Sequence, residues 1–408
     1  MGFTVEQECP QCGAPIELDE TDHLLRCPYC NVSNFLFTPN YFRFLLPHRA
    51  PGKDIIYAPY LRFRGNVFFC SGWNVGHRIV DITQAGVSLT GLPMTLGLRP
   101  QAMKMRFVTP DTAGSFLKFS LKASELLKRA GKLPSGSSSG RLFHRAYIGE
   151  ALSLIYLPMF RDGDRLFDAI LAKPLVNLPQ GRDAIEQATE KNPRWKLIFM
   201  PTLCPQCGWN LHAERDSIVL TCSNCEKAWE ASEGRFVPVS FEVAAGGEEH
   251  SEYLPFWKIS ATARGIEINS FSDFVRLTNQ PRVAGKGWEN EVMIFWSPAF
   301  KIRPKVFLRL SSQLTISQYR FQTEETLRGK NLYPVTLPLS EATQAMKTIL
   351  AGSAVNKKGV LPHLPHLRFD IKDSALVYLP FKEIGSEMIQ QHVSISINKH
   401  TLEFGRQL

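Results

Sequence analysis

The fold of this chain is decided by Cys9-Pro-Gln-Cys12 and, fourteen residues later, Cys27-Pro-Tyr-Cys30. Two residues between paired thiolates let one turn of the backbone present both sulfurs to the same ion. Fourteen residues between the pairs leave room for a β-hairpin that returns the second pair to the first. The four cysteines therefore predict one tetrathiolate metal site.

The same arrangement recurs 195 residues further along the chain. Cys204-Pro-Gln-Cys207 and Cys222-Ser-Asn-Cys225 again enclose fourteen residues. In the first set we expect a hairpin of 15–18 with 23–26, and in the second a hairpin formed across the turn at 214–217. A second tetrathiolate site is therefore predicted.

Both segments resemble the zinc-ribbon family, a rubredoxin-like pair of four-cysteine knuckles that many transcription and translation proteins contain. The resemblance covers the two cysteine segments and not the rest of the chain. It implies two structural metal sites, with zinc as the common occupant and iron as the alternative for four thiolates. The predicted metal ligands are Cys9, Cys12, Cys27, Cys30, Cys204, Cys207, Cys222 and Cys225.

Other uses of the nine cysteines are disfavoured. The opening residues lack the basic and apolar regions of a secretion signal, so we expect a soluble cytoplasmic protein without structural disulfides. A dithiol redox centre would need only one pair. The ninth cysteine, Cys70, follows Val67-Phe-Phe and is expected to be a small buried side chain rather than a reactive thiol.

A longer repeat follows the ribbons. Tyr57-Ala-Pro-Tyr60 matches Tyr253-Leu-Pro-Phe256 at an offset of 196, and Leu154-Ile-Tyr-Leu-Pro158 matches Leu376-Val-Tyr-Leu-Pro380 at 222. The second copy would carry an insertion of 26 residues, the difference between these offsets. Chance similarity of short strings is the alternative, but their common order after each ribbon favours duplication.

The predicted fold class is α+β, mainly β, with an internal duplication of a module made of a zinc ribbon and a β-rich domain with one or two helices. The predicted domains are ribbon 1 at 1–35, a β-rich α+β domain at 36–178, a helical linker at 179–193, ribbon 2 at 194–233, and a second β-rich α+β domain at 234–408.

Local patterns place the elements within this scheme. We expect strands at 55–57, 66–69, 105–108, 195–200 and 291–296, helices at 113–130, 183–190 and 340–350, and a flexible loop at 131–141. Proline within the Tyr-x-Pro strands predicts an edge or a bulge. The aromatic neighbours favour packing between ribbon and sheet, with a ligand groove as the alternative.

The net charge of +9 is unevenly distributed. Each ribbon, 9–30 and 204–233, carries −3, whereas 43–145 carries +12 and 301–358 carries +7. Because phosphate binding needs cations, the acidic ribbons are expected to be structural plugs or protein-docking knobs. The alternation in 301–305 indicates a half-exposed strand, with an anion-binding face as the alternative.

The sequence offers no recognised catalytic motif. His363 and His366 have metal-like spacing, but Pro362 and Pro365 favour an exposed turn. Arg161-Asp-Gly-Asp-Arg165 offers two carboxylates, yet a polar hairpin turn accounts for it and for its counterpart at 382–387.

We therefore expect a non-enzymatic zinc-binding interaction or assembly protein that presents two ribbon-headed β modules to a protein partner. The alternative is a nucleic-acid-binding protein, or one that meets an anionic surface, through the basic bodies at 43–145 and 301–358. An enzyme with an unrecognised site is the third hypothesis. No segment predicts a transmembrane helix.

Overall fold

The fold was determined from a computed structural model that describes residues 2–131, 140–177, 188–190, 195–283, 285–324 and 326–406. Strands dominate over helices in these residues, which confirms the mainly β, α+β class. The expected helix at 183–190 and loop at 131–141 lie largely outside them. No helix in the described ranges is both long enough and apolar enough to cross a membrane.

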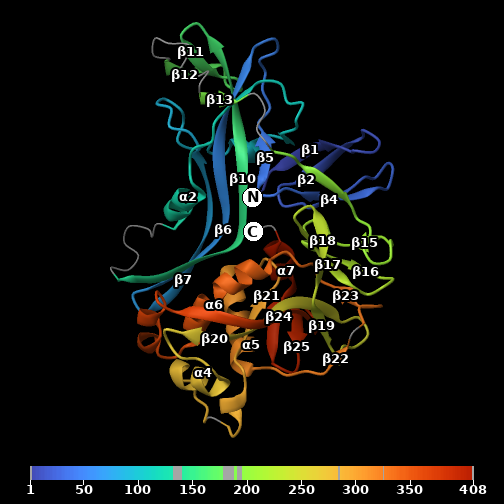
Figure 1. Ribbon diagram of the computed structural model, residues 1–408, viewed down its shortest axis with the longest axis vertical. Coiled ribbons are helices and arrows are strands. Elements are labelled where there is room, and N and C mark those ends of the chain that lie inside the picture. Colours follow the sequence, from blue (N-terminus) through green and yellow to red (C-terminus); the bar gives the residue numbers. More distant parts are fainter. Residues whose placement is uncertain are drawn as a thin grey trace.

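Three long strands build the first half: β6 (Ile55–Ser71), β7 (Asn74–Ala85) and β10 (Leu142–Asp162). β6 lies between β10 and β7 and pairs antiparallel with both. In Figure 1 these strands run from the top of the molecule down to the second half. The strands expected at 55–57 and 66–69 are thus one strand, which continues because the arginines between them are buried and paired.

Short strands complete the first sheet in the order β13-β9-β6-β10-β5-β8-β1-β2, and β11 and β12 extend it from β10. Their bounds are β1 (Thr4–Glu8), β2 (Pro15–Asp19), β5 (Phe42–Leu45), β8 (Met105–Phe107), β9 (Ser115–Leu117), β11 (Arg165–Asp168), β12 (Lys173–Asn177) and β13 (Thr189–Glu190). Two helices accompany them, α1 (Arg99–Ala102) and α2 (Ala123–Ala130).

The helix expected at 113–130 is wrong over its first half. β9 occupies that stretch and pairs parallel with β6, and α2 begins only at Ala123. The reason lies in Phe116, whose buried ring stacks on Tyr57 with the ring centroids 4.9 Å apart. Phe116 and Leu117 therefore lie in the sheet, whereas Leu126 and Leu127 lie in the helix.

The two ribbons contribute two smaller sheets. One has the order β14-β4-β3 and the other β15-β16-β17-β18. Their bounds are β3 (Leu24–Arg26), β4 (Ser33–Phe37), β14 (Ile198–Pro201), β15 (Leu211–His212), β16 (Val219–Cys222), β17 (Ala228–Ser232) and β18 (Arg235–Val239).

The expected ribbon hairpins are half right. In ribbon 2, β15 pairs with β16 as predicted. In ribbon 1, however, β2 pairs with β1 and β3 pairs with β4, so the expected pairing of 15–18 with 23–26 is wrong. In the turn between β2 and β3, Glu20 pairs with Arg62 and Arg64 of β6, and Asp22 pairs with Arg215 of ribbon 2.

The second half is a sheet of order β21-β20-β24-β19-β22, with β23 pairing β20, and β25 and β26 extending from β24. The strands are β19 (Phe241–Ala244), β20 (Glu252–Arg264), β21 (Ile294–Pro298), β22 (Thr323–Glu324), β23 (Asn331–Leu332), β24 (Arg368–Ile384), β25 (Glu387–Gln390) and β26 (Ile395–Asn398). The helices are α4 (Phe271–Thr278), α5 (Pro304–Ser317), α6 (Leu339–Ser353) and α7 (Lys399–Gly405), with single 3-10 turns at η1 (Trp288–Asn290), η2 (Lys357–Gly359) and η3 (Leu361–His363).

Two expectations for this half have opposite outcomes. The helix at 340–350 is confirmed as α6. The half-exposed strand expected at 301–305 is wrong, because α5 begins at Pro304 and buries Phe307 and Leu310 on one face. Pro304 stands in the first helical turn, where its missing N–H costs nothing.

The central strand pairs of the two sheets share one register. Tyr57 lies opposite Pro158 and Pro59 opposite Tyr156, while Tyr253 lies opposite Pro380 and Pro255 opposite Tyr378. On the other side, β9 and β23 each run parallel to the first residues of the central strand, next to Tyr57 and Tyr253.

Both prolines lie in interior strands, contrary to the expected edge or bulge. Pro59 falls between the stretch of β6 that pairs with β9 and the stretch that pairs with β7. Pro255 falls in the same gap between β23 and β21. Each accepts a bond at its carbonyl oxygen, from Gly86 N at 2.7 Å and from Ala299 N at 3.0 Å. Because no neighbour pairs at the proline nitrogen there, the sheet loses no donor.

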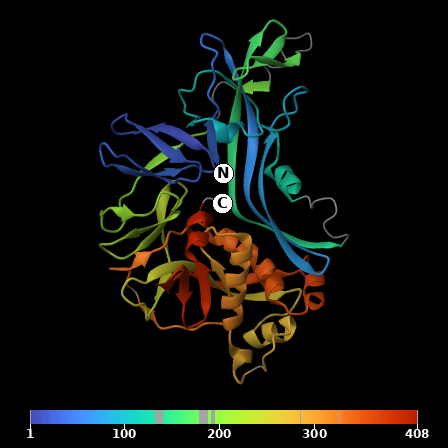
Figure 2. The ribbon, with the colours of Figure 1, turned by 180° about the vertical axis from the view of Figure 1, so that it is seen from behind.

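The first half has its own hydrophobic core and also contributes to that of the second. Phe68, Cys70, Ala146 and Ile148 from the first half are buried within the core of the second. The Phe68 ring lies 5.7 Å from that of Phe307 on α5, centroid to centroid. Figures 1 and 2 both show the lower ends of the long strands beside the helices of the second half. Cys70 is buried as predicted, and burial raises the pKa of its thiol to about 12.

Candidate metal centres and the cavity between the halves

The eight predicted ligands come together as two groups of four. Within each group the sulfur atoms all lie within 4.8 Å of one another: Cys9, Cys12, Cys27 and Cys30 in the first, and Cys204, Cys207, Cys222 and Cys225 in the second. The closest Sγ–Sγ distances are 3.6 Å in the first group and 3.5 Å in the second. Thiolates at ~2.3 Å from one tetrahedral ion stand about 3.8 Å apart, so each group could hold a metal ion.

The knuckle loops have a common backbone form. The residue after the second cysteine of each pair has a positive φ, at Gly13, Asn31, Gly208 and Glu226. In the first knuckle, Gly13 N donates to Cys9 O at 2.9 Å, and Gly208 N donates to Cys204 O at the same distance. Glycine and asparagine tolerate this left-handed conformation, which is the local signal of the turn.

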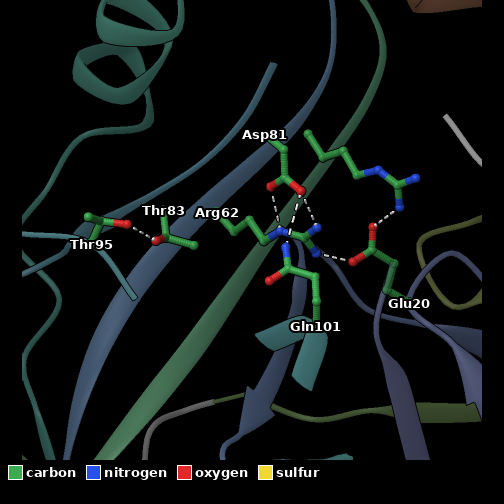
Figure 3. Close-up of polar contacts among 7 residues, drawn as sticks. Glu20, Arg62, Asp81, Thr83, Thr95 and Gln101 are labelled. Carbon is green, nitrogen blue, oxygen red and sulfur yellow. Dashed lines mark hydrogen bonds and ion pairs between the residues drawn. The ribbon is translucent and has the colours of Figure 1, made fainter. Parts of the chain in front are cut away.

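Ribbon 1 is anchored to the body by a buried ion-pair network (Figure 3). Glu20, just after β2, accepts hydrogen bonds from the guanidinium groups of Arg62 and Arg64 on β6. Arg62 also donates to both carboxylate oxygens of Asp81 on β7, at 2.9 and 2.8 Å. Glu20 and Arg62 are 9% and 1% exposed. The acidic turn of ribbon 1 therefore binds cations of its own chain.

Ribbon 2 makes equivalent contacts to the second half. Arg406 donates to both oxygens of Asp216 in the acidic turn. Glu226, beside the last cysteine, accepts from Leu327 N at 2.8 Å and from the Thr326 hydroxyl at 2.7 Å. Both acidic ribbons thus form charged contacts within the molecule.

The ribbons also pack on each other. β14, which leads into ribbon 2, pairs antiparallel with β4, which leads out of ribbon 1. Arg215 O accepts from His23 N and Leu24 N at 2.7 and 2.8 Å. A separate small core contains Leu24 and Phe35 from ribbon 1 together with Leu220 and Trp229 from ribbon 2. Both ribbons lie on the same side of the molecule in the two views (Figures 1 and 2).

Three large apolar side chains remain exposed at the knuckles. Tyr29, between Cys27 and Cys30, is 69% exposed, and Leu203 and Trp209, on either side of the first pair in ribbon 2, are 51% and 57% exposed. Two adjoining grooves lie in this region, one of about 720 Å³ lined by Leu203 and one of about 410 Å³ lined by Trp209. We refer to Tyr29, Leu203, Trp209 and these grooves as the knuckle face.

A cavity of about 430 Å³ lies where ribbon 1, β10, ribbon 2 and α6 meet. Burial lowers the pKa of His23 to about 4, with a contribution from the charge of Lys301. Burial and the nearby Glu150 raise the pKa of Glu341 to about 7. The sequence does not point to these residues, because each comes from a different segment and no local motif links them.

The other candidates from the sequence are turns. His363 ends η3. Among the residues that the structure describes, neither His363 nor His366 belongs to a group of three or more potential metal ligands. Arg165 faces Asp162 across the β10–β11 hairpin, and Glu387 faces Ile384 across the β24–β25 hairpin, so both predicted polar turns are confirmed.

Comparison of the chain with models of known protein families, with curated proteins and with solved structures found no match.

Proposed function

We propose that this chain is a non-enzymatic, duplicated two-zinc protein whose knuckle face binds an acidic, apolar segment of a protein partner. The observation that carries the proposal is the exposure of Tyr29, Leu203 and Trp209 on ribbons that are otherwise anchored to the body. Exposed aromatic residues on a rigid support are typical anchors of protein interfaces.

Zinc is proposed as the metal because four thiolates in a short ribbon suit it best. Four thiolates also leave no open coordination position, so the metal role is structural. Elemental analysis of protein purified without chelator should give two zinc ions per chain. Iron in their place would correct the identity of the metal, and the absence of any metal would contradict the proposal.

Duplication accounts for the shared register of the two sheets. Matching sequence strings by chance would not also place Tyr57 and Tyr253 opposite equivalent prolines. The gap in the pairing at Pro59 and Pro255 recurs as well, with an equivalent hydrogen bond to each carbonyl. We infer that one ribbon-headed module was copied and that α4 belongs to the added residues of the second copy.

The chemistry of the partner follows from the charges beside the knuckle face. The larger groove is lined by Arg26 and by Lys330, which pairs with Glu324, with Glu214 as its acidic residue, and the smaller groove adds Arg328. A partner segment with Asp or Glu beside apolar residues would be complementary to this lining. Leu203 lines the larger groove and Trp209 the smaller, so apolar side chains of the partner would have places to bury.

Site-specific photo-crosslinking tests this face directly. A photo-reactive phenylalanine analogue at Trp209 should crosslink a discrete partner in cells, and the partner segment that is captured should be acidic. The purified partner should then bind the wild-type protein at least about tenfold more tightly than the Trp209→Ala variant, because truncation of an aromatic anchor typically weakens an interface by this much. Leu98→Ala is the matched control, because Leu98 is 80% exposed and lies outside the knuckle face. Equal affinity of both variants would contradict the proposal.

Nucleic-acid binding through the basic bodies has less support. Arg62 and Arg64 are buried against Glu20, Lys104 pairs with Glu17, and Arg106 pairs with Glu6. Part of the basic charge is thus matched to the acidic ribbon. A filter-binding titration separates the two functions, because phosphate contacts predict affinity that falls steeply with salt.

A further inference from the structure

The cavity between the halves collects ionisable groups that are far apart in the sequence. His23 comes from ribbon 1, Glu150 from β10, Glu230 from β17, Lys301 from the segment before α5, and Glu341 from α6. Glu341 is buried and the other four are half-buried. This composition differs from the apolar contacts that join the halves elsewhere.

An irregularity in β10 shapes the cavity. The pairing of β10 with β6 shifts register between Ile148 and Ala151, and Gly149 has a φ of +67°. The freed backbone N–H groups of Gly149 and Glu150 both donate to one carboxylate oxygen of Glu341. Such bulges commonly redirect a side chain beside a functional site. Here the bulge holds the Glu341 carboxyl group and places Glu150 in the cavity wall.

The cavity is short of positive charge. Glu20 is matched by Arg62 and Arg64, so it leaves no surplus. The remaining carboxyl groups of Glu150, Glu230 and Glu341 face one ammonium group, that of Lys301. Burial raises the pKa of all three carboxyl groups, and the charge of Glu150 adds to the rise at Glu341, which Lys301 opposes.

The spacing of these carboxyl groups disfavours a metal ion. Within the described residues, only the two cysteine groups bring three or more potential ligand atoms within 4.8 Å of one another. The carboxyl groups are instead spread over a cavity of about 430 Å³, within the ordinary range for small organic ligands. Phe35, Tyr41 and Phe42 supply an aromatic wall.

We propose that this cavity binds a small organic cation, an amine or guanidinium group on an apolar stem. The carboxylate of Glu150 pairs with the cationic head, the Glu341 carboxyl group accepts a further hydrogen bond from that head, and the aromatic wall contacts the stem and the charge. Lys301 offsets part of the negative charge and so limits the affinity for the cation. The site is separate from the knuckle face and does not depend on the function proposed for that face.

Isothermal titration calorimetry with N-butylguanidinium tests the site in the full, metal-loaded chain. We expect saturable binding of one cation per chain, and no binding of N-butylurea, which has nearly the same shape without the charge. Glu150→Gln should weaken binding about tenfold or more, since it removes a charge-assisted hydrogen bond. Glu267→Gln is the matched control, because Glu267 is exposed and lies outside the cavity lining.

Lys301→Met provides a variant with the opposite expected sign. Removing the competing ammonium group should tighten binding of N-butylguanidinium, an effect that damage to the fold would not produce. Metal content and circular dichroism establish that each variant is folded. No binding at millimolar concentration, equal affinity for N-butylurea, or unchanged affinity in both Glu150→Gln and Lys301→Met would overturn the proposal.

Discussion

Glu20 shows how much one residue of a ribbon contributes to the body. Its carboxylate is buried and accepts hydrogen bonds from two arginines of β6, so it joins ribbon 1 to a long strand of the sheet. Removing the Glu20 carboxylate takes an ionised partner from two buried guanidinium groups, those of Arg62 and Arg64, and such a loss destabilises the fold.

Glu20→Gln should therefore destabilise the protein by about 3 kcal/mol, the scale observed when one partner of a buried ion pair is removed. Urea unfolding monitored by circular dichroism measures the change. Glu17→Gln in the same ribbon is the control, because Glu17 is 60% exposed at its side chain and its pairing with Lys104 lies at the surface. Equal midpoints for the two variants would show that the Glu20 network contributes no stability.

Glu341 should make stability depend on pH. Its pKa is raised from 4.5 to about 7 in the folded protein, by burial and by Glu150, while Lys301 and two backbone N–H groups oppose the rise. The folded state thus prefers the neutral carboxyl group. The preference of the folded state for protonated Glu341 adds up to about 3 kcal/mol to the free energy of unfolding. This contribution is complete below pH ~4.5 and is lost as the pH rises through about 7.

The difference between wild type and Glu341→Gln isolates this effect. His23 has a lowered pKa in the folded protein, so it lowers the free energy of unfolding as the pH falls below about 6.5. This effect is opposite to that of Glu341, but it is present in both wild type and the variant. Urea unfolding at pH 5 and pH 8 should show the variant gaining stability relative to wild type at pH 8. A difference that does not change with pH would refute the assignment to Glu341.

Among the elements, the ribbons are coupled through β14 and β4, whose pairing joins the two metal segments. Metal binding in such small segments is coupled to folding, because the ligands are gathered only in the folded form. Loss of one metal should therefore loosen the neighbouring ribbon as well.

Cys222→Ser should lower the metal content from two ions to one and increase amide hydrogen exchange in both ribbons, at β16 and also at β4. Hydrogen exchange followed by mass spectrometry measures this segment by segment. Cys70→Ser is the control, because Cys70 is buried away from both metal groups and should leave the metal content at two. Increased exchange confined to ribbon 2 would show that the ribbons are independent.

Local chemistry explains which elements could be predicted. The knuckles follow from cysteine spacing and from Gly13 and Gly208, which suit a left-handed turn. α4 and α5 were missed although each has a local signal, a capping box between Ser270 and Asp273 and a proline in the first turn at Pro304.

Long-range contacts explain what could not be predicted. The β9 segment has the periodicity of a helix, and only the available edge of β6 makes it a strand. The cavity depends on Glu150 and Glu341, which are 191 residues apart and meet through a bulge. No local pattern encodes such a meeting, because it requires both halves to be folded and packed.

At the scale of the whole molecule, apolar packing joins the two halves beside the charged cavity. The ends of β6 and β10 supply Phe68 and Ile148 to the core around α5 and α6. Interfaces between independent domains are usually smaller and more polar, which permits relative motion. This apolar packing indicates that the halves unfold together.

Fragments 1–177 and 195–408 should therefore each be unstable alone and should recover structure when mixed. Differential scanning calorimetry of the whole chain should show one transition, and Phe68→Ala should shift that whole transition downward, with a loss of about 3–5 kcal/mol for a buried phenylalanine. Leu98→Ala, at an exposed position, is the control. Two separate transitions, with only one affected by Phe68→Ala, would contradict unfolding of the halves together.

The pairing of β14 with β4 has a consequence for synthesis on the ribosome. All four cysteines of ribbon 1 leave the ribosome early. One edge of β4 stays unpaired, however, until β14, which ends at residue 201, has been synthesised. The ends of β6 and β10 likewise wait, with apolar side chains exposed, for helices that come more than 150 residues after β10 begins. A half-made chain can therefore hold its first metal while presenting a free strand edge and an uncovered apolar surface, the features that recruit chaperones or lead to aggregation.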